Sequence, residues 1–138
     1  MRVHNFKFRK IHKVRALKRL DYKNLSLLYG LYGLRSLESK RLLDIQLFSA
    51  QGTIKKKIKK SGIIWPRVHL TRFITKKPGE TRMGKGKGSF SNSVCVVQKG
   101  SILFELGGPF LKKKLALEAL RLASSKLPIK TEIILYKS

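Results

Sequence analysis

The sequence is poor in acidic residues and cysteine, and it has no long apolar run. Only 7 Asp and Glu stand against 32 Lys and Arg, and the acids are scattered singly, so no carboxylate pair suited to acid–base catalysis is visible. The single cysteine, Cys95, excludes an internal disulfide, and three dispersed histidines do not complete a zinc site. Lys or Arg interrupts every apolar stretch before it reaches the roughly 18 residues of a membrane span. The sequence therefore predicts neither an enzyme, nor a metalloprotein, nor a membrane-spanning protein.

Positive charge dominates what is present. The formal net charge is +25 over 138 residues, a field that opposes compaction unless an anionic partner neutralises it. At the same time 42% of the residues are hydrophobic, which is too many for a disordered basic tail and predicts a folded core. The length favours a single domain over residues 1–138. A folded domain that binds the phosphates of nucleic acid, most simply RNA, satisfies both properties.

Short β-like runs separated by turn residues predict strands. Residues 25–37 are expected to form a bent strand pair, and residues 63–74 a strand that Pro66 confines to a sheet edge or a bulge. Residues 94–98 and 102–106 flank Lys99-Gly100, which is typical of a β-hairpin turn, and residues 129–136 are expected as a last strand. Because strands and helices do not alternate strictly, the pattern predicts an α+β fold with an antiparallel or mixed sheet.

Two main helices are expected from apolar residues spaced three and four apart. The first is predicted to begin with Ser39 as its cap and to end at Gly62, and the second to start at Pro109 and stop at Pro128. The lysines on the polar face of the first helix, at positions 55, 56, 57, 59 and 60, are expected to contact phosphate. The predicted buried stripes are Leu43, Leu47, Ala50, Ile54 and Ile58 in the first helix, and Leu111, Leu115, Ala119 and Leu122 in the second.

A long loop rich in Gly and Lys is expected over residues 76–91. Its alternating glycines and lysines let backbone N–H groups and ammonium groups approach phosphate oxygens. Its spacing of glycines before Lys85 matches a nucleotide-binding P-loop, but Gly86 stands where Ser or Thr would hold magnesium, and Pro78 stands where a strand should precede. A merely flexible solvent loop is the remaining alternative.

Two other segments predict RNA contact. Residues 1–20 hold eight Lys and Arg and no acid, and because they also lack Ser and helical apolar spacing, they are expected to form part of an extended basic arm over residues 1–23, not a mitochondrial presequence. Trp65 is suited to stack on an unpaired base while Arg67 holds a neighbouring phosphate, although a strand also allows Trp65 to enter the core. A basic peripheral membrane protein is disfavoured, because both predicted helices are short and their stripes suit a core.

Several ordered blocks make the sequence resemble the large-subunit ribosomal protein sixteen family of bacteria and organelles. The most specific block is the loop motif Arg-Met-Gly-Lys-Gly-Lys-Gly at residues 82–88. Residues 20–50 match the family pattern poorly. The other blocks are Lys7 to Lys10, His12-Lys13 and Arg15 in the arm, Ile64-Trp65, Arg67-Val68 and Ile74-Thr75 in the centre, and Leu103 to Glu105 and Lys126 to Lys130 toward the end.

The resemblance implies a structural component of the large ribosomal subunit, with no cofactor and no homo-oligomer. Its partners would be large-subunit rRNA, neighbouring ribosomal proteins and, transiently, the tRNA in the aminoacyl site beside the peptidyl-transferase centre. The loop would reach toward that tRNA and the arm would contact rRNA. With Trp65, Arg67 and Lys77 added from the residue patterns, the predicted RNA-binding set is Lys7, Arg9, Lys10, His12, Lys13, Arg15, Trp65, Arg67, Lys77, Arg82, Met83, Gly84, Lys85, Gly86, Lys87 and Gly88.

The composition also bears on the compartment. Phe, Ile, Leu, Tyr and Lys are favoured, which resembles the product of an AT-rich mitochondrial genome. The sequence therefore predicts a protein of the mitochondrial ribosome, with the plastid and the bacterial cytoplasm as alternatives.

Overall fold

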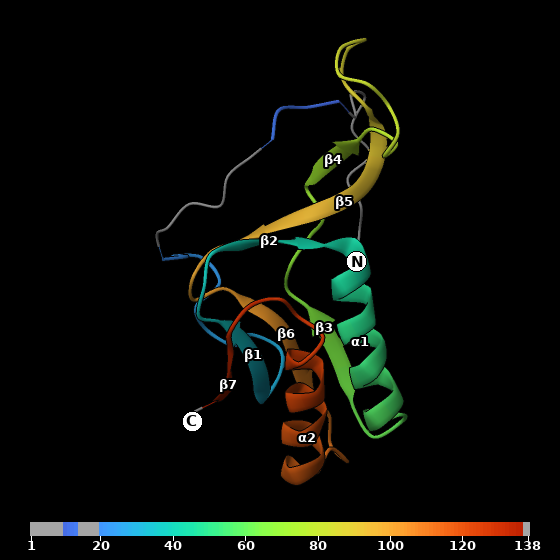
Figure 1. Cartoon of the computed structure of the whole chain (residues 1–138). Coiled ribbons are helices and arrows are strands. Elements are labelled where there is room, and N and C mark those ends of the chain that lie inside the picture. Colours follow the sequence, from blue (N-terminus) through green and yellow to red (C-terminus); the bar gives the residue numbers. More distant parts are fainter. Residues whose placement is uncertain (1–9, 14–19, 137–138) are drawn as a thin grey trace.

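The computed structural model describes residues 10–13 and 20–136 and places two helices beside two antiparallel sheets (Figure 1). This confirms the predicted α+β fold. The elements in chain order are β1 (Tyr32–Ser36), β2 (Lys40–Leu43), α1 (Asp44–Ile58), β3 (Ile63–Pro66), β4 (Arg72–Lys76), β5 (Ser89–Val97), β6 (Ile102–Gly107), α2 (Lys113–Ser124) and β7 (Thr131–Leu135).

The four-stranded sheet, in the order β3-β6-β1-β7, forms the packed half of the molecule with the helices. Strand β6 lies inside this sheet, and all six of its residues are buried. Helix α2 packs against α1, β1 and β7, and the two helices lie side by side in Figure 1. Pro66 ends the edge strand β3, where its missing N–H leaves no ladder bond unmade, as predicted.

The three-stranded sheet, in the order β2-β5-β4, carries the Gly/Lys loop away from the helices. Strand β5 pairs with β2 only through Val94 to Val97, whereas its pairing with β4 begins at Ser89. The outer part of β5 therefore has β4 as its only partner strand in this sheet. Figure 1 shows the loop extending from the end of this β4–β5 ribbon, far from α1 and α2.

The predicted hairpin across Lys99-Gly100 is wrong, because β5 and β6 belong to different sheets. The turn itself exists: Gly100 has φ +90, and the Ser101 N–H donates to the Gln98 carbonyl at 3.2 Å. The Gly100 N–H, however, donates to the Ser36 carbonyl at 2.8 Å. The chain thus uses the turn to pass from one sheet to the other.

The first helix begins later than predicted. Strand β2 precedes it, and Ser39 accepts a hydrogen bond from the Lys99 N–H at 2.9 Å instead of capping the helix. At the other end Lys59, with φ +53, terminates α1, so Gly62 is not its end residue. The buried face was predicted correctly at Leu47, Ala50, Ile54 and Ile58.

Two other predictions also need correction. In residues 25–37 only β1 is a strand, because the preceding backbone donates to a side chain instead of to a partner strand. Helix α2 starts at Lys113, four residues after Pro109, and Leu122 of its predicted buried stripe is 42% exposed, because the buried face runs through Leu120 and Ala123 instead. Its buried residues are Ala116, Ala119, Leu120 and Ala123.

Candidate nucleic-acid interface

The loop between β4 and β5 is an exposed and sharply bent segment. Three consecutive residues at its tip have positive φ: Gly84 (+93), Lys85 (+54) and Gly86 (+79). Glycine adopts this conformation at little cost, which explains two of the three positions. The Lys77 ammonium group donates to the Gly84 carbonyl and so connects the base of the loop to its tip. Met83 is 97% exposed, and every residue from Pro78 to Lys87 is exposed to solvent.

The arm lies against this loop. The Lys87 ammonium group donates to the Ile11 carbonyl at 2.5 Å, and the Lys10 ammonium group donates to the Lys87 carbonyl at 3.4 Å. Lys10, His12 and Lys13 are exposed beside it. The structure therefore joins two predicted RNA-binding segments, 76 residues apart in the chain, into one basic surface. The predicted arm residues Lys7, Arg9 and Arg15 lie outside the described residues.

Trp65 and Arg67 lie on the other sheet, apart from the arm and the loop. The half-buried Trp65 ring stacks on Tyr29, with ring centroids 6.2 Å apart. The Arg67 guanidinium donates to the fully buried Glu105 and to Asn24 at 3.2 Å, and its side chain is only 10% exposed. The structure thus gives this guanidinium internal partners, and its contact with a phosphate stays a prediction.

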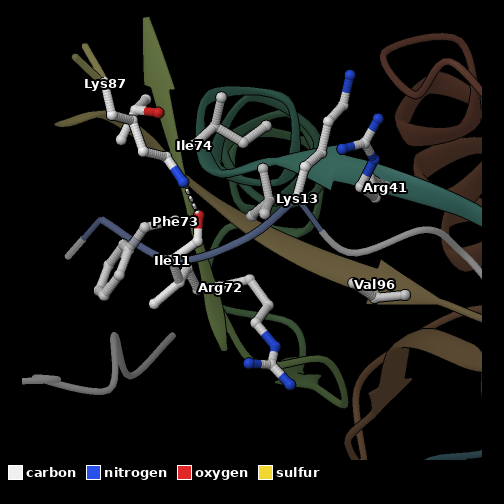
Figure 2. A pocket seen from close by; sticks show the side chains of 10 residues that line it. Ile11, Lys13, Arg41, Arg72, Phe73, Ile74, Lys87 and Val96 are labelled. Carbon is white, nitrogen blue, oxygen red and sulfur yellow. Dashed lines mark hydrogen bonds between the residues drawn. The ribbon is translucent and has the colours of Figure 1, made fainter. Parts of the chain in front are cut away.

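Two arginines that the sequence did not single out border the arm. Arg41 on β2 and Arg72 on β4 line a pocket together with Lys13 and Lys87 (Figure 2). Arg41 follows Lys40 in a strand of four residues and Arg72 stands between Thr71 and Phe73, so no local motif marks either arginine. On α1, by contrast, the predicted basic face is exposed at positions 55, 56, 59 and 60, while Lys57 pairs with Glu118 at 2.7 Å.

The described part of the chain offers no other chemistry at this surface. No three His, Cys, Asp or Glu side chains among the described residues gather into a metal site. Within the same ranges no helix is long and apolar enough to cross a bilayer. Cys95 is buried, and desolvation raises the pKa of its thiol to about 11, which makes it a poor nucleophile. What the surface provides is a set of cations on a fixed scaffold.

Comparison with known sequences identifies the family. The sequence profile of the family described as ribosomal protein L16p/L10e matches residues 3–134. The chain belongs to this family. A member of the L16p/L10e family is a structural component of the large ribosomal subunit that acts in translation, and it is not an enzyme.

The relatives of this L16p/L10e chain match it nearly from end to end. The large ribosomal subunit protein uL16 of Psychrobacter arcticus is 47% identical over 128 residues, which cover 93% of this chain and 91% of that protein. The uL16 of Blochmanniella pennsylvanica is 43% identical, with 93% and 92% covered. The uL16m of Prototheca wickerhamii is 41% identical over 132 residues, with 96% of both chains covered.

Proposed function

We propose that the chain binds large-subunit rRNA and helps to shape the aminoacyl-tRNA site near the peptidyl-transferase centre. The observation that carries this proposal is the basic surface formed by the arm and the loop, which Lys87 and Ile11 hold together. Phosphate contacts position a protein on RNA, and exposed Lys and Arg with accessible backbone are the groups that make them. The helices and the four-stranded sheet supply the rigid body that carries this surface.

The loop tip is the part that we assign to tRNA. Residues 82–88 carry the family motif, and all of them except Gly88 are exposed in the loop that extends from the β4–β5 ribbon. The arm residues Lys10, His12 and Lys13, at the base of the loop, are assigned to rRNA. In this arrangement rRNA fixes the base of the loop while its tip remains free to contact a transient ligand.

Sedimentation of the full chain with ribosomal particles tests the assignment to rRNA. In a magnesium-containing density gradient the protein is expected in the large-subunit fraction, and its recovery at the top of the gradient would overturn the proposal. Raising the salt from about 50 to about 200 mM should weaken binding to isolated rRNA roughly a thousandfold or more, as for a protein with 6–10 phosphate contacts. A flat salt dependence would contradict the electrostatic argument.

The tRNA assignment is tested separately with a double substitution in the loop. Arg82→Ala with Lys85→Ala, which keeps the Lys87–Ile11 contact in place, should leave incorporation into the large subunit largely intact and weaken the binding of tRNA to the aminoacyl site. The control, Lys113→Ala with Lys114→Ala, removes the same charge from exposed positions on α2, at the opposite end of the molecule. Equal loss of tRNA binding in both variants would show that net charge alone, and not the loop, is responsible.

We also propose that the compartment is the mitochondrion. The composition bias toward Phe, Ile, Leu, Tyr and Lys and the similarity to uL16m of Prototheca wickerhamii support this, whereas the other relatives compared here are bacterial proteins. Immunoblotting of purified mitochondria, plastids and cytosol is the test. Enrichment of the chain with mitochondrial ribosomes is expected, and enrichment in the plastid fraction would overturn this assignment.

A further inference from the structure

A pocket of about 110 Å³ lies between the arm and the three-stranded sheet. Figure 2 shows the segment around Ile11 passing across β4 and β5, so that the arm forms one wall and the strands form the others. Phe73, Ile74, Val94 and Val96 supply the apolar part of the lining. The pocket therefore exists only because the arm crosses the sheet at this place.

The border of this pocket is cationic. Lys13 on the arm, Arg41 on β2, Arg72 on β4 and Lys87 at the end of the loop all line it, and no carboxylate is among its ten described lining residues. In Figure 2 Lys13 and Arg41 stand on one side of the arm segment and Arg72 on the other. Charges of one sign thus surround an apolar interior from several directions.

This combination narrows the class of ligand. A simple anion would use the cations and leave the apolar interior without a partner, whereas an apolar ligand would leave four cations without one. A nucleotide within RNA would contact both the apolar interior and the cations, since its base has flat apolar faces and a phosphate precedes and follows it in the strand. An apolar cavity of about 150 Å³ is known to hold one benzene ring. This pocket, at about 110 Å³, is slightly smaller, so a base would enter it only in part.

We propose that this pocket binds one unpaired RNA base, with the flanking phosphates held by Lys13, Arg41, Arg72 and Lys87. The proposal rests on the proposed function and deepens it: at this place the protein would recognise an extruded nucleotide and not only the shape of an RNA helix. Contact with an apolar lining tolerates any base, because every base has an apolar face, so the site is expected to select for a single-stranded nucleotide more than for a sequence.

The first test measures whether a base is needed. At fixed salt, the full chain is titrated with fluorescently labelled hexaadenylate RNA and with a fully abasic ribose-phosphate strand of the same length. Fluorescence anisotropy should report about tenfold tighter binding of hexaadenylate, the contribution of one base contact. Equal affinity for the two strands would mean that only phosphates bind, and would overturn the proposal.

Substitutions then locate the base. Val96→Phe fills the pocket and should remove the preference for hexaadenylate while leaving the affinity for the abasic strand unchanged. Arg72→Ala should weaken the binding of hexaadenylate and of the abasic strand by the same factor, because it removes a phosphate contact. Ile63→Phe, the control, adds the same ring at an exposed position of the edge strand β3 and should change the affinity for neither RNA strand. A preference retained in a folded Val96→Phe variant would overturn the proposal.

A measurement on the unmodified protein covers the case in which Val96→Phe fails to fold. Hexauridylate containing 4-thiouridine is photocrosslinked to the full chain, and the attached peptides are identified by mass spectrometry. Crosslinks at Ile11 and at residues 72–75 are expected, and crosslinks confined to residues 77–86, which do not line the pocket, would overturn the proposal. Because association with ribosomal particles is read separately in the gradient, a chain that enters the large subunit but does not distinguish the two strands would refute this inference alone.

Discussion

Arg67 and Glu105 form an ion pair in which the two side chains are 10% and 0% exposed. The same Glu105 carboxylate accepts hydrogen bonds from three consecutive backbone N–H groups, of Leu28 at 3.2 Å, Tyr29 at 2.8 Å and Gly30 at 3.0 Å. Across the described residues no buried side-chain polar atom is left without a partner. One carboxylate at the centre of β6 therefore fixes the chain that leads into β1.

Replacing Glu105 should be among the most destabilising single changes in the protein. Glu105→Ala would leave the Arg67 charge and three N–H groups without their acceptor, and removing one partner of a buried ion pair costs about 3–5 kcal/mol. Urea unfolding followed by Trp65 fluorescence measures this loss. Glu132→Ala is the control, because the Arg35–Glu132 pair, at 2.7 Å, has side chains 33% and 46% exposed and should contribute about 1 kcal/mol or less. Similar losses in the two variants would contradict this account.

The fold was predictable where the signal is local. The buried face of α1 follows from apolar residues at helical spacing, and the turn at Lys99-Gly100 follows from its residue types. Local sequence does not determine whether the two strands that flank this turn pair with each other. Here the Gly100 N–H donates to Ser36 and the Ile102 N–H donates to Asn24, so contacts with residues more than 60 positions away decide that the chain changes sheets.

The candidate site divides in the same way. The loop was predictable because its glycines and lysines are consecutive, whereas Arg41 and Arg72 meet Lys87 only through the strand order β2-β5-β4. For Arg67 the sequence predicted a phosphate partner from its charge, but it gave no sign of Glu105, which the fold places beside it. The partner of a charged residue in a strand, or directly after one as Arg67 is, could therefore not be predicted without the sheet order.

The thiol of Cys95 should be unreactive in the folded protein. Burial raises its pKa to about 11, so that at pH 8 only about one thiol in a thousand is the reactive thiolate, and the side chain is 5% exposed. Iodoacetamide at pH 8 should therefore modify the native protein far more slowly than the protein in urea, as followed by intact mass. Equal rates in the two conditions would show that β5 opens readily.

Asp21 should make the stability depend on pH below about 4. Its burial raises the pKa, but hydrogen bonds from Ser101, Lys23 and Asn24 outweigh this, and the net pKa lies below 3.8. A carboxyl whose folded pKa is lowered stabilises the fold above its unfolded pKa, and this contribution is lost as the pH falls through the folded value. The wild type should therefore exceed Asp21→Asn in free energy of unfolding at pH 7, with the difference shrinking as the pH falls below 3.8. A difference that stays constant between these pH values would contradict the assignment.

Gly88 should be intolerant of any side chain, because the two ends of the loop meet there. A Cβ atom at Gly88 would lie 2.6 Å from the Lys76 carbonyl oxygen and 2.8 Å from the Lys77 nitrogen, which are backbone atoms that cannot rotate away. Gly88→Ala should therefore force β4 and β5 apart at the loop and cost about 1–3 kcal/mol, the usual range for overpacking. Gly79→Ala is the matched control in the same loop, since no atom lies within 4 Å of a Cβ at that position. Thermal unfolding of the two variants decides the point: a melting temperature lowered only by Gly88→Ala supports a closed loop base, and unchanged melting in both would mean that the base can open without cost.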